Sequence, residues 1–105
     1  MQLDLRLVDF KEEADLHAQL ASFFGFPAFY GANIHALIDC WSSLRYEEDG
    51  MSKIHLGLEE QLILRLSAYD SPSGKRWLFL LLDAVAAVNE RAKEAGQVPL
   101  IYLLF

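Results

Sequence analysis

The sequence predicts an α/β domain in which a small three-stranded parallel sheet is covered by helices. Three short apolar segments have the features of strands, at residues 2–8, 62–66 and 99–105, and helical patterns separate them. Strands that alternate with helices form parallel sheets with right-handed crossovers. The chain has 105 residues, of which 53% are hydrophobic, and this suits one domain spanning 1–105 with a single core.

The first strand and the first helix are predicted from residues 2–25. Leucines alternate with polar residues over 2–8, and a period of two is typical of a strand. Asp9 and Glu12 then have the spacing of a capping box, although Asp15 is an alternative start for the helix. Gly25 can end this helix. Its apolar stripe consists of Leu16, Leu20, Phe23 and Phe24.

A second helix is predicted from Ile34 to about Leu44, after a turn. Gly31 can adopt the positive φ that the turn needs, and the Asn33 side chain can cap the helix. At 100° per residue the helix has two faces. The apolar arc contains Ile34, Leu37, Cys40, Trp41 and Leu44, with Ile38 at its border. The polar arc contains His35, Asp39, Ser42 and Ser43.

The rest of the chain is predicted as an irregular segment, a strand, a long helix and a final strand. Residues 45–60 have no clean period, so this segment is functional, mobile or partly structured. Residues 62–66 form a buried strand, and residues 75–95 form a helix that ends at Gly96. Residues 99–105 are nearly all apolar and form the last strand. Trp41 and Trp77 are expected in the core, and His17 is expected to be a structural histidine.

Charge and composition exclude several classes of function. Residues 1–60 carry eleven acids and four bases, whereas residues 61–105 carry four acids and five bases. Such a surface repels phosphate backbones, so no direct nucleic-acid binding is expected, but it attracts a basic protein. The one cysteine fits a reducing cytoplasm. The N-terminus does not resemble a signal peptide, and the most apolar run is too short for a membrane span.

The sequence gives little support to an enzyme, and no metal or cofactor is expected. Cys40 lies on the apolar arc of its helix, about 140° away from His35, so His35 cannot act as its base. His17, His35 and His55 lack the spacing of metal ligands. No phosphate-binding loop or dinucleotide fingerprint occurs.

Two segments carry a resemblance to a known family. They read D-L-H-A-Q-L at residues 15–20 and F-P-A-F-Y-G-A-N-I-H-A-L-I-D-C at residues 26–40. They resemble the barstar family of ribonuclease inhibitors, which shows D-L-H followed by P-x-Y-Y-G-x-N-L-D-A-L-W-D-C. The likeness is good over residues 1–44 and looser over 61–105.

The resemblance implies a function and a contact surface. Such proteins block the active-site cleft of a basic ribonuclease with the second helix and the preceding loop, and acidic side chains take the place of the RNA phosphate. Asp39 matches the family's central acid, and Phe29 stands at the position of a contact aromatic. The resemblance implies a partner-binding surface made of Phe29, Tyr30, Asn33, His35, Ile38, Asp39, Ser42, Ser43 and Leu44. The chain is then expected to be a monomer with a protein partner.

The chain also departs from the family pattern. His35 replaces an aspartate, Ile38 replaces a tryptophan, and Arg91 falls where a glutamate contacts the ribonuclease. Residues 45–60 form a longer segment than the family has. These changes favour a different nuclease as partner, or a non-inhibitory interaction or self-associating domain with the same fold. The inhibitor interpretation requires the Asp39 carboxylate to face outward and to have no neighbouring guanidinium as its partner.

Overall fold

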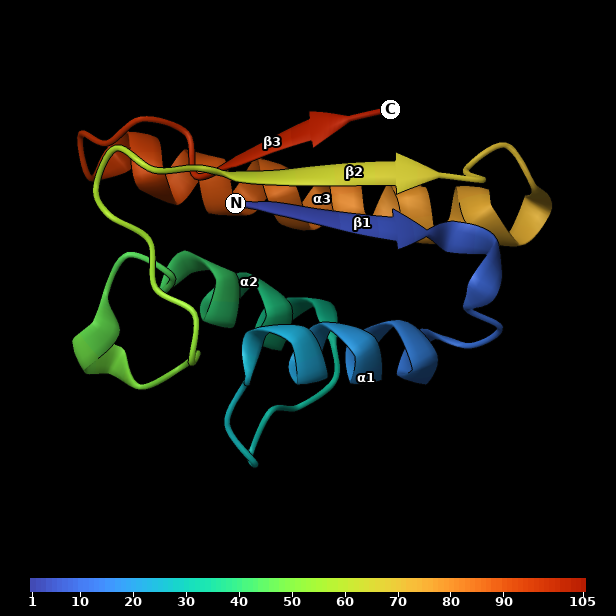
Figure 1. Cartoon of the computed structure of the whole chain (residues 1–105), viewed down its shortest axis with the longest axis horizontal. Coiled ribbons are helices and arrows are strands. Elements are labelled where there is room, and N and C mark those ends of the chain that lie inside the picture. The colour runs from blue at the N-terminus through green and yellow to red at the C-terminus, as the bar shows by residue number, and fades with distance from the viewer.

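The computed structural model describes residues 1–105 and confirms the predicted fold class. Three parallel strands form one sheet in the order β1–β2–β3, and three helices complete the domain (Figure 1). The strands are β1 (Gln2–Arg6), β2 (Leu62–Ser67) and β3 (Ile101–Leu104). The helices are α1 (Glu13–Phe24), α2 (Ile34–Ser42) and α3 (Pro72–Glu94).

The helices cover only one face of the sheet. Side chains of β1 and β2 alternate strictly between exposed and buried positions, and the buried leucines point toward the helices. Figure 1 shows α3 running behind the strands, while α1 and α2 lie below β1. The prediction of a buried strand at residues 62–66 is therefore half correct, because Ile63 and Arg65 face solvent.

Two helix starts differ in detail from the prediction. Helix α1 starts after Glu12, and the Asp15 carboxylate accepts hydrogen bonds from the backbone N–H groups of Lys11 and Glu12. Asp9 instead belongs to a short 3₁₀ turn that follows β1. Its carboxylate forms an ion pair with Arg6, with 2.6 Å between Asp9 Oδ1 and Arg6 Nη1. Helix α3 begins earlier than predicted because the Ser71 hydroxyl caps it, with Pro72 in its first turn.

A single hydrophobic core joins the sheet to all three helices. Trp41 and Trp77 lie inside it, as predicted, and the Trp77 indole donates a hydrogen bond to the Phe10 carbonyl at 2.8 Å. Phe24 of α1 meets Trp41 of α2 edge to face, with ring centroids 6.1 Å apart. Helix α2 is thus anchored on one side, which leaves its other side free to define a surface.

The segment between α2 and β2 is partly structured, which was one of the three predicted alternatives. It contains a 3₁₀ turn at Glu47–Asp49, and it buries Ser52 and Leu56. The Ser52 hydroxyl donates to the Phe24 carbonyl, and the Leu56 N–H donates to the Leu44 carbonyl. These bonds hold the segment against the C-terminal ends of α1 and α2.

Candidate functional site

The loop before α2 is held in place from α1. His17 is buried, as predicted for a structural histidine, and its Nδ1 lies 2.6 Å from the Tyr30 hydroxyl. Its Nε2 lies 3.1 Å from a Glu13 carboxylate oxygen. Burial is the main cause that raises the pKa of the Tyr30 hydroxyl far above its usual value, and the charges of Cys40 and Glu13 add to it. Tyr30 therefore supports the loop, and its half-buried side chain also lines a cavity beside Phe29.

The turn itself differs from the prediction at one residue. Gly31 does not adopt a positive φ, whereas the neighbouring Ala32 does, with φ of 50°. Asn33 caps α2 as predicted, because its Oδ1 accepts a hydrogen bond from the Ala36 N–H at 2.8 Å. A Cβ on Gly31 would lie 3.2 Å from Asn33 Nδ2, so a larger residue there would require the Asn33 side chain to shift by a few tenths of an ångström.

Helix α2 has the two predicted faces and ends at Ser42, short of the predicted end near Leu44. Two of the predicted contact residues are buried. Leu44 is fully buried, and Ile38 is only 9% exposed. Both belong to the core cluster. Neither side chain can contact a partner unless the core is exposed, so the predicted contact surface is wrong at these two residues. Ile38 lies at the border of the apolar arc, where the helical pattern alone does not determine burial.

The remaining polar face of α2 is open to solvent. His35 and Asp39 are exposed, while Ser42 and Ser43 are half-buried. In the preceding loop Phe29 is 76% exposed, which is unusual for a large apolar side chain. Phe29 and Asp39 line a cavity of about 140 Å³ together with Met51, whose role the sequence did not indicate. This surface combines an aromatic side chain with an acid.

Asp39 meets one of the two requirements of the inhibitor interpretation, namely that its carboxylate faces outward, but it does not meet the other. Its side chain is 58% exposed and faces outward from α2, as the inhibitor interpretation requires. However, its Oδ1 accepts a hydrogen bond from Arg91 Nη1 at 3.0 Å. The same Nη1 donates to the Ser42 hydroxyl at 3.3 Å. The requirement that no guanidinium should pair with this carboxylate is therefore not met.

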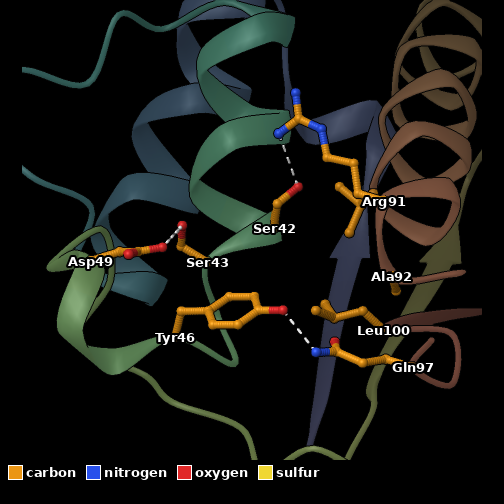
Figure 2. A pocket seen from close by; sticks show the side chains of 9 residues that line it. Ser42, Ser43, Tyr46, Asp49, Arg91, Ala92, Gln97 and Leu100 are labelled. Atoms are coloured by element: carbon orange, nitrogen blue, oxygen red, sulfur yellow. Dashed lines mark hydrogen bonds between the residues drawn. The ribbon is translucent and has the colours of Figure 1, made fainter. Parts of the chain in front are cut away.

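Helices α2 and α3 pack against each other, and a groove lies between their C-terminal ends. Figure 2 shows Arg91 reaching from α3 toward Ser42, while Asp49 accepts a hydrogen bond from Ser43 on the opposite side of the groove. The groove has a volume of about 230 Å³. A hydrogen bond of 2.7 Å between the Gln97 amide and the Tyr46 hydroxyl crosses its floor. The acidic turn Glu47–Asp49 is exposed, and its Asp49 lines the groove near the C-terminal end of α2.

Cys40 has the environment of a structural thiol. It is buried, and desolvation together with the Asp39 charge raises its pKa to about 11. A thiol that stays protonated at neutral pH is a poor nucleophile. No three metal-binding side chains lie close enough to hold an ion. No helix is both long enough and apolar enough to cross a membrane.

Comparison with known proteins supports the resemblance seen in the motifs. A search of curated proteins finds no relative that matches the chain. The family model described as Barstar (barnase inhibitor) matches residues 1–100. This match covers both motif segments, the three helices and strands β1 and β2, and it ends just before β3. The chain therefore belongs to the barstar family.

Proposed function

We propose that this protein binds and inhibits a basic ribonuclease by covering its active-site cleft with α2 and the preceding loop. The observation that carries the proposal is the exposed surface formed by Phe29, His35 and Asp39 in a chain of the barstar family. The surface lies on a helix whose opposite face is buried in the core. A rigid scaffold costs little entropy on binding.

The ion pair with Arg91 changes how Asp39 would act. Both side chains are about half exposed, and exposed ion pairs typically contribute only about 0–1 kcal/mol. A cation of the partner can therefore join or replace Arg91 at little cost to the fold. In the complex, water is excluded, and the carboxylate would form stronger, charge-assisted hydrogen bonds with the ribonuclease. Asp39 thus acts as half of an exchangeable pair.

The acidic turn supports the same proposal. Glu47, Glu48 and Asp49 are exposed beside the groove and add negative charge to this end of the molecule. Asp49 shares a hollow with Asp39, so these acids add to the charge at the C-terminal half of α2. Complementary charge accelerates the encounter with a basic protein and makes the rate depend on salt.

The test is inhibition of small basic ribonucleases, beginning with barnase, at several salt concentrations. We expect Asp39→Ala to weaken inhibition at least about 10-fold, because a charge of the partner loses its counterpart in the interface. Asp70→Ala is the matched control, because it removes the same charge from an exposed residue in the turn between β2 and α3. Inhibition that is insensitive both to salt and to Asp39→Ala would contradict the mechanism.

One observation favours the alternative of a self-associating domain. The uncovered face of the sheet exposes apolar side chains of β2 and β3 and of the C-terminus, namely Ile63, Tyr102, Leu104 and Phe105. A second copy could cover them. Sedimentation velocity separates the two candidates, because an inhibitor is expected to sediment as a monomer. A stable dimer that Tyr102→Ser dissociates would favour self-association.

A further inference from the structure

Arg91 has unused binding capacity at the centre of the candidate surface. Both of its hydrogen bonds, to Asp39 and to Ser42, use Nη1. Its Nη2 and Nε bind no other group of the protein, and the side chain is 51% exposed. A guanidinium with a free edge binds a carboxylate through two parallel hydrogen bonds. The free edge of Arg91 is therefore suited to an acidic side chain of a partner.

The surface around Arg91 carries both signs of charge. Arg91 lies on the α3 side of the groove, and Asp49 lies on the opposite side, where it accepts a hydrogen bond from the Ser43 hydroxyl (Figure 2). A second hollow of about 420 Å³ is lined by Asp39, Arg91 and Asp49 together. A partner that fits this surface must place positive charge near Asp49 and negative charge near Arg91.

A wholly cationic cleft fits this surface poorly. Any cation that approaches Asp39 also approaches Arg91, because the two groups are 3.0 Å apart. Like charges that are brought together in an interface and lose their water are strongly disfavoured. Arg91 therefore penalises a partner that presents only cations to Asp39. The penalty falls if the partner adds a carboxylate that pairs with the free edge of Arg91.

We propose that Arg91 is a specificity-determining residue, which selects a basic protein partner that carries one carboxylate within its cationic surface. The inference rests on the proposed function. It assigns to α3 a role in choosing the partner, in addition to the contact made by α2. The Asp39–Arg91 pair then binds two opposite charges on the partner instead of a single cation.

The experiment uses barnase and a set of barnase variants in which each cleft Arg or Lys is replaced in turn by Glu. Each is titrated with the wild-type chain and with Arg91→Glu. We expect the wild type to bind at least one Glu variant at least about 10-fold more tightly than barnase. We expect Arg91→Glu to reverse this order and to bind barnase about 100-fold more tightly than the wild type does.

Lys93→Glu is the matched control. Replacing Lys93 by Glu makes the same change in net charge as Arg91→Glu. Lys93 is exposed on the same last turn of α3, but it does not pair with Asp39. We expect it to alter either affinity by no more than about 3-fold, since exposed charges outside the contact are screened. Equal effects of Arg91→Glu and Lys93→Glu on both partners would overturn the inference.

Asp39→Ala separates this failure from failure of the proposed function. If Asp39→Ala weakens binding while Arg91→Glu acts only like Lys93→Glu, the inhibitor surface stands and the role of Arg91 is refuted. If no combination of chains and barnase variants binds, the proposed function falls and the inference falls with it. A reversed order of preference that also depends on Asp39 supports both.

Discussion

Two irregular segments flank α2, and they are held by different kinds of bond. The loop at residues 25–33 is held by side chains: the Tyr30 hydroxyl contacts His17, and Asn33 caps α2. The segment at residues 45–61 is held mainly through backbone carbonyls. Arg45 is the clearest case, because its guanidinium donates to the carbonyls of Glu60, Val98 and Pro99.

The difference shows how α2 is fixed at both ends. At its N-terminus the polar partners are residues of the recognisable motif. At its C-terminus a buried guanidinium joins the start and end of the long segment to the chain between α3 and β3. Burial lowers the pKa of Arg45, an effect that the nearby Tyr46 and Tyr102 oppose. Burying a guanidinium costs desolvation free energy, and removing its hydrogen-bond partners once it is buried costs still more.

The largest predicted effect is on the second segment. Arg45→Met removes the hydrogen bonds to three carbonyls and leaves those carbonyls partly unsatisfied. We expect the free energy of unfolding to fall by about 3 kcal/mol. Urea denaturation followed by far-UV circular dichroism measures it. Arg65→Met is the control, because Arg65 is exposed on β2, and it should cost less than about 0.5 kcal/mol. Equal losses would show that Arg45 does not hold the segment.

A smaller effect is expected in the first segment. Tyr30→Phe removes the hydroxyl that lies 2.6 Å from His17 Nδ1 and leaves this buried nitrogen without a partner. We expect a loss of about 1–2 kcal/mol in the free energy of unfolding. Phe26 packs against the Tyr30 ring, with centroids 4.8 Å apart, so the ring itself should stay in place. A loss below about 0.3 kcal/mol would mean that packing alone holds this loop.

The same tyrosine predicts that the stability of the protein depends on alkaline pH. The pKa of Tyr30 is raised in the folded state, so its contribution to stability is present below pH 10 and is lost as pH rises further. Cys40 adds to this loss from about pH 9, because its pKa is raised from 9.0 to about 11. We expect Tyr30→Phe to flatten the stability curve above pH 10, and Tyr30→Phe with Cys40→Ala to flatten it from pH 9.

A matched measurement tests the thiol directly. Iodoacetamide should alkylate native Cys40 much more slowly than a free thiol at pH 8, because the buried group stays protonated. Rapid alkylation of the folded protein would contradict its placement and would reopen the question of a reactive cysteine.

The two segments also show how far the sequence predicts this molecule. Strand and helix periods predicted the fold, and the cap at Asn33 followed from a local rule that needs only neighbouring residues. The bonds of Arg45 could not be predicted, because backbone carbonyls look alike in any sequence and Val98 lies far from Arg45 along the chain. Local chemistry can be read from the sequence, whereas long-range contacts with the backbone cannot.

The candidate site divides in the same way. The exposure of Phe29 and Asp39 followed from the motif and from the helical arcs. Leu44 was misplaced because the resemblance outweighed its position on the apolar arc. Arg91 was recognised as a departure from the family, but its pairing with Asp39 depends on how α3 packs against α2, which no local pattern specifies.

The smallest predicted effect concerns the turn at Gly31 and Ala32, which directly precedes α2. Ala32 adopts φ of 50°, and this left-handed conformation costs a residue with a Cβ about 1 kcal/mol. Ala32→Gly relieves this cost, but glycine also gives the unfolded chain more freedom, so the net gain should be at most about 0.5 kcal/mol. Gly31→Ala is the informative comparison. Gly31 has no positive φ, but its added Cβ would crowd the Asn33 cap at 3.2 Å, so this change should destabilise the protein slightly. If both substitutions destabilise the protein equally, the left-handed conformation of Ala32 is not the strained point of the loop.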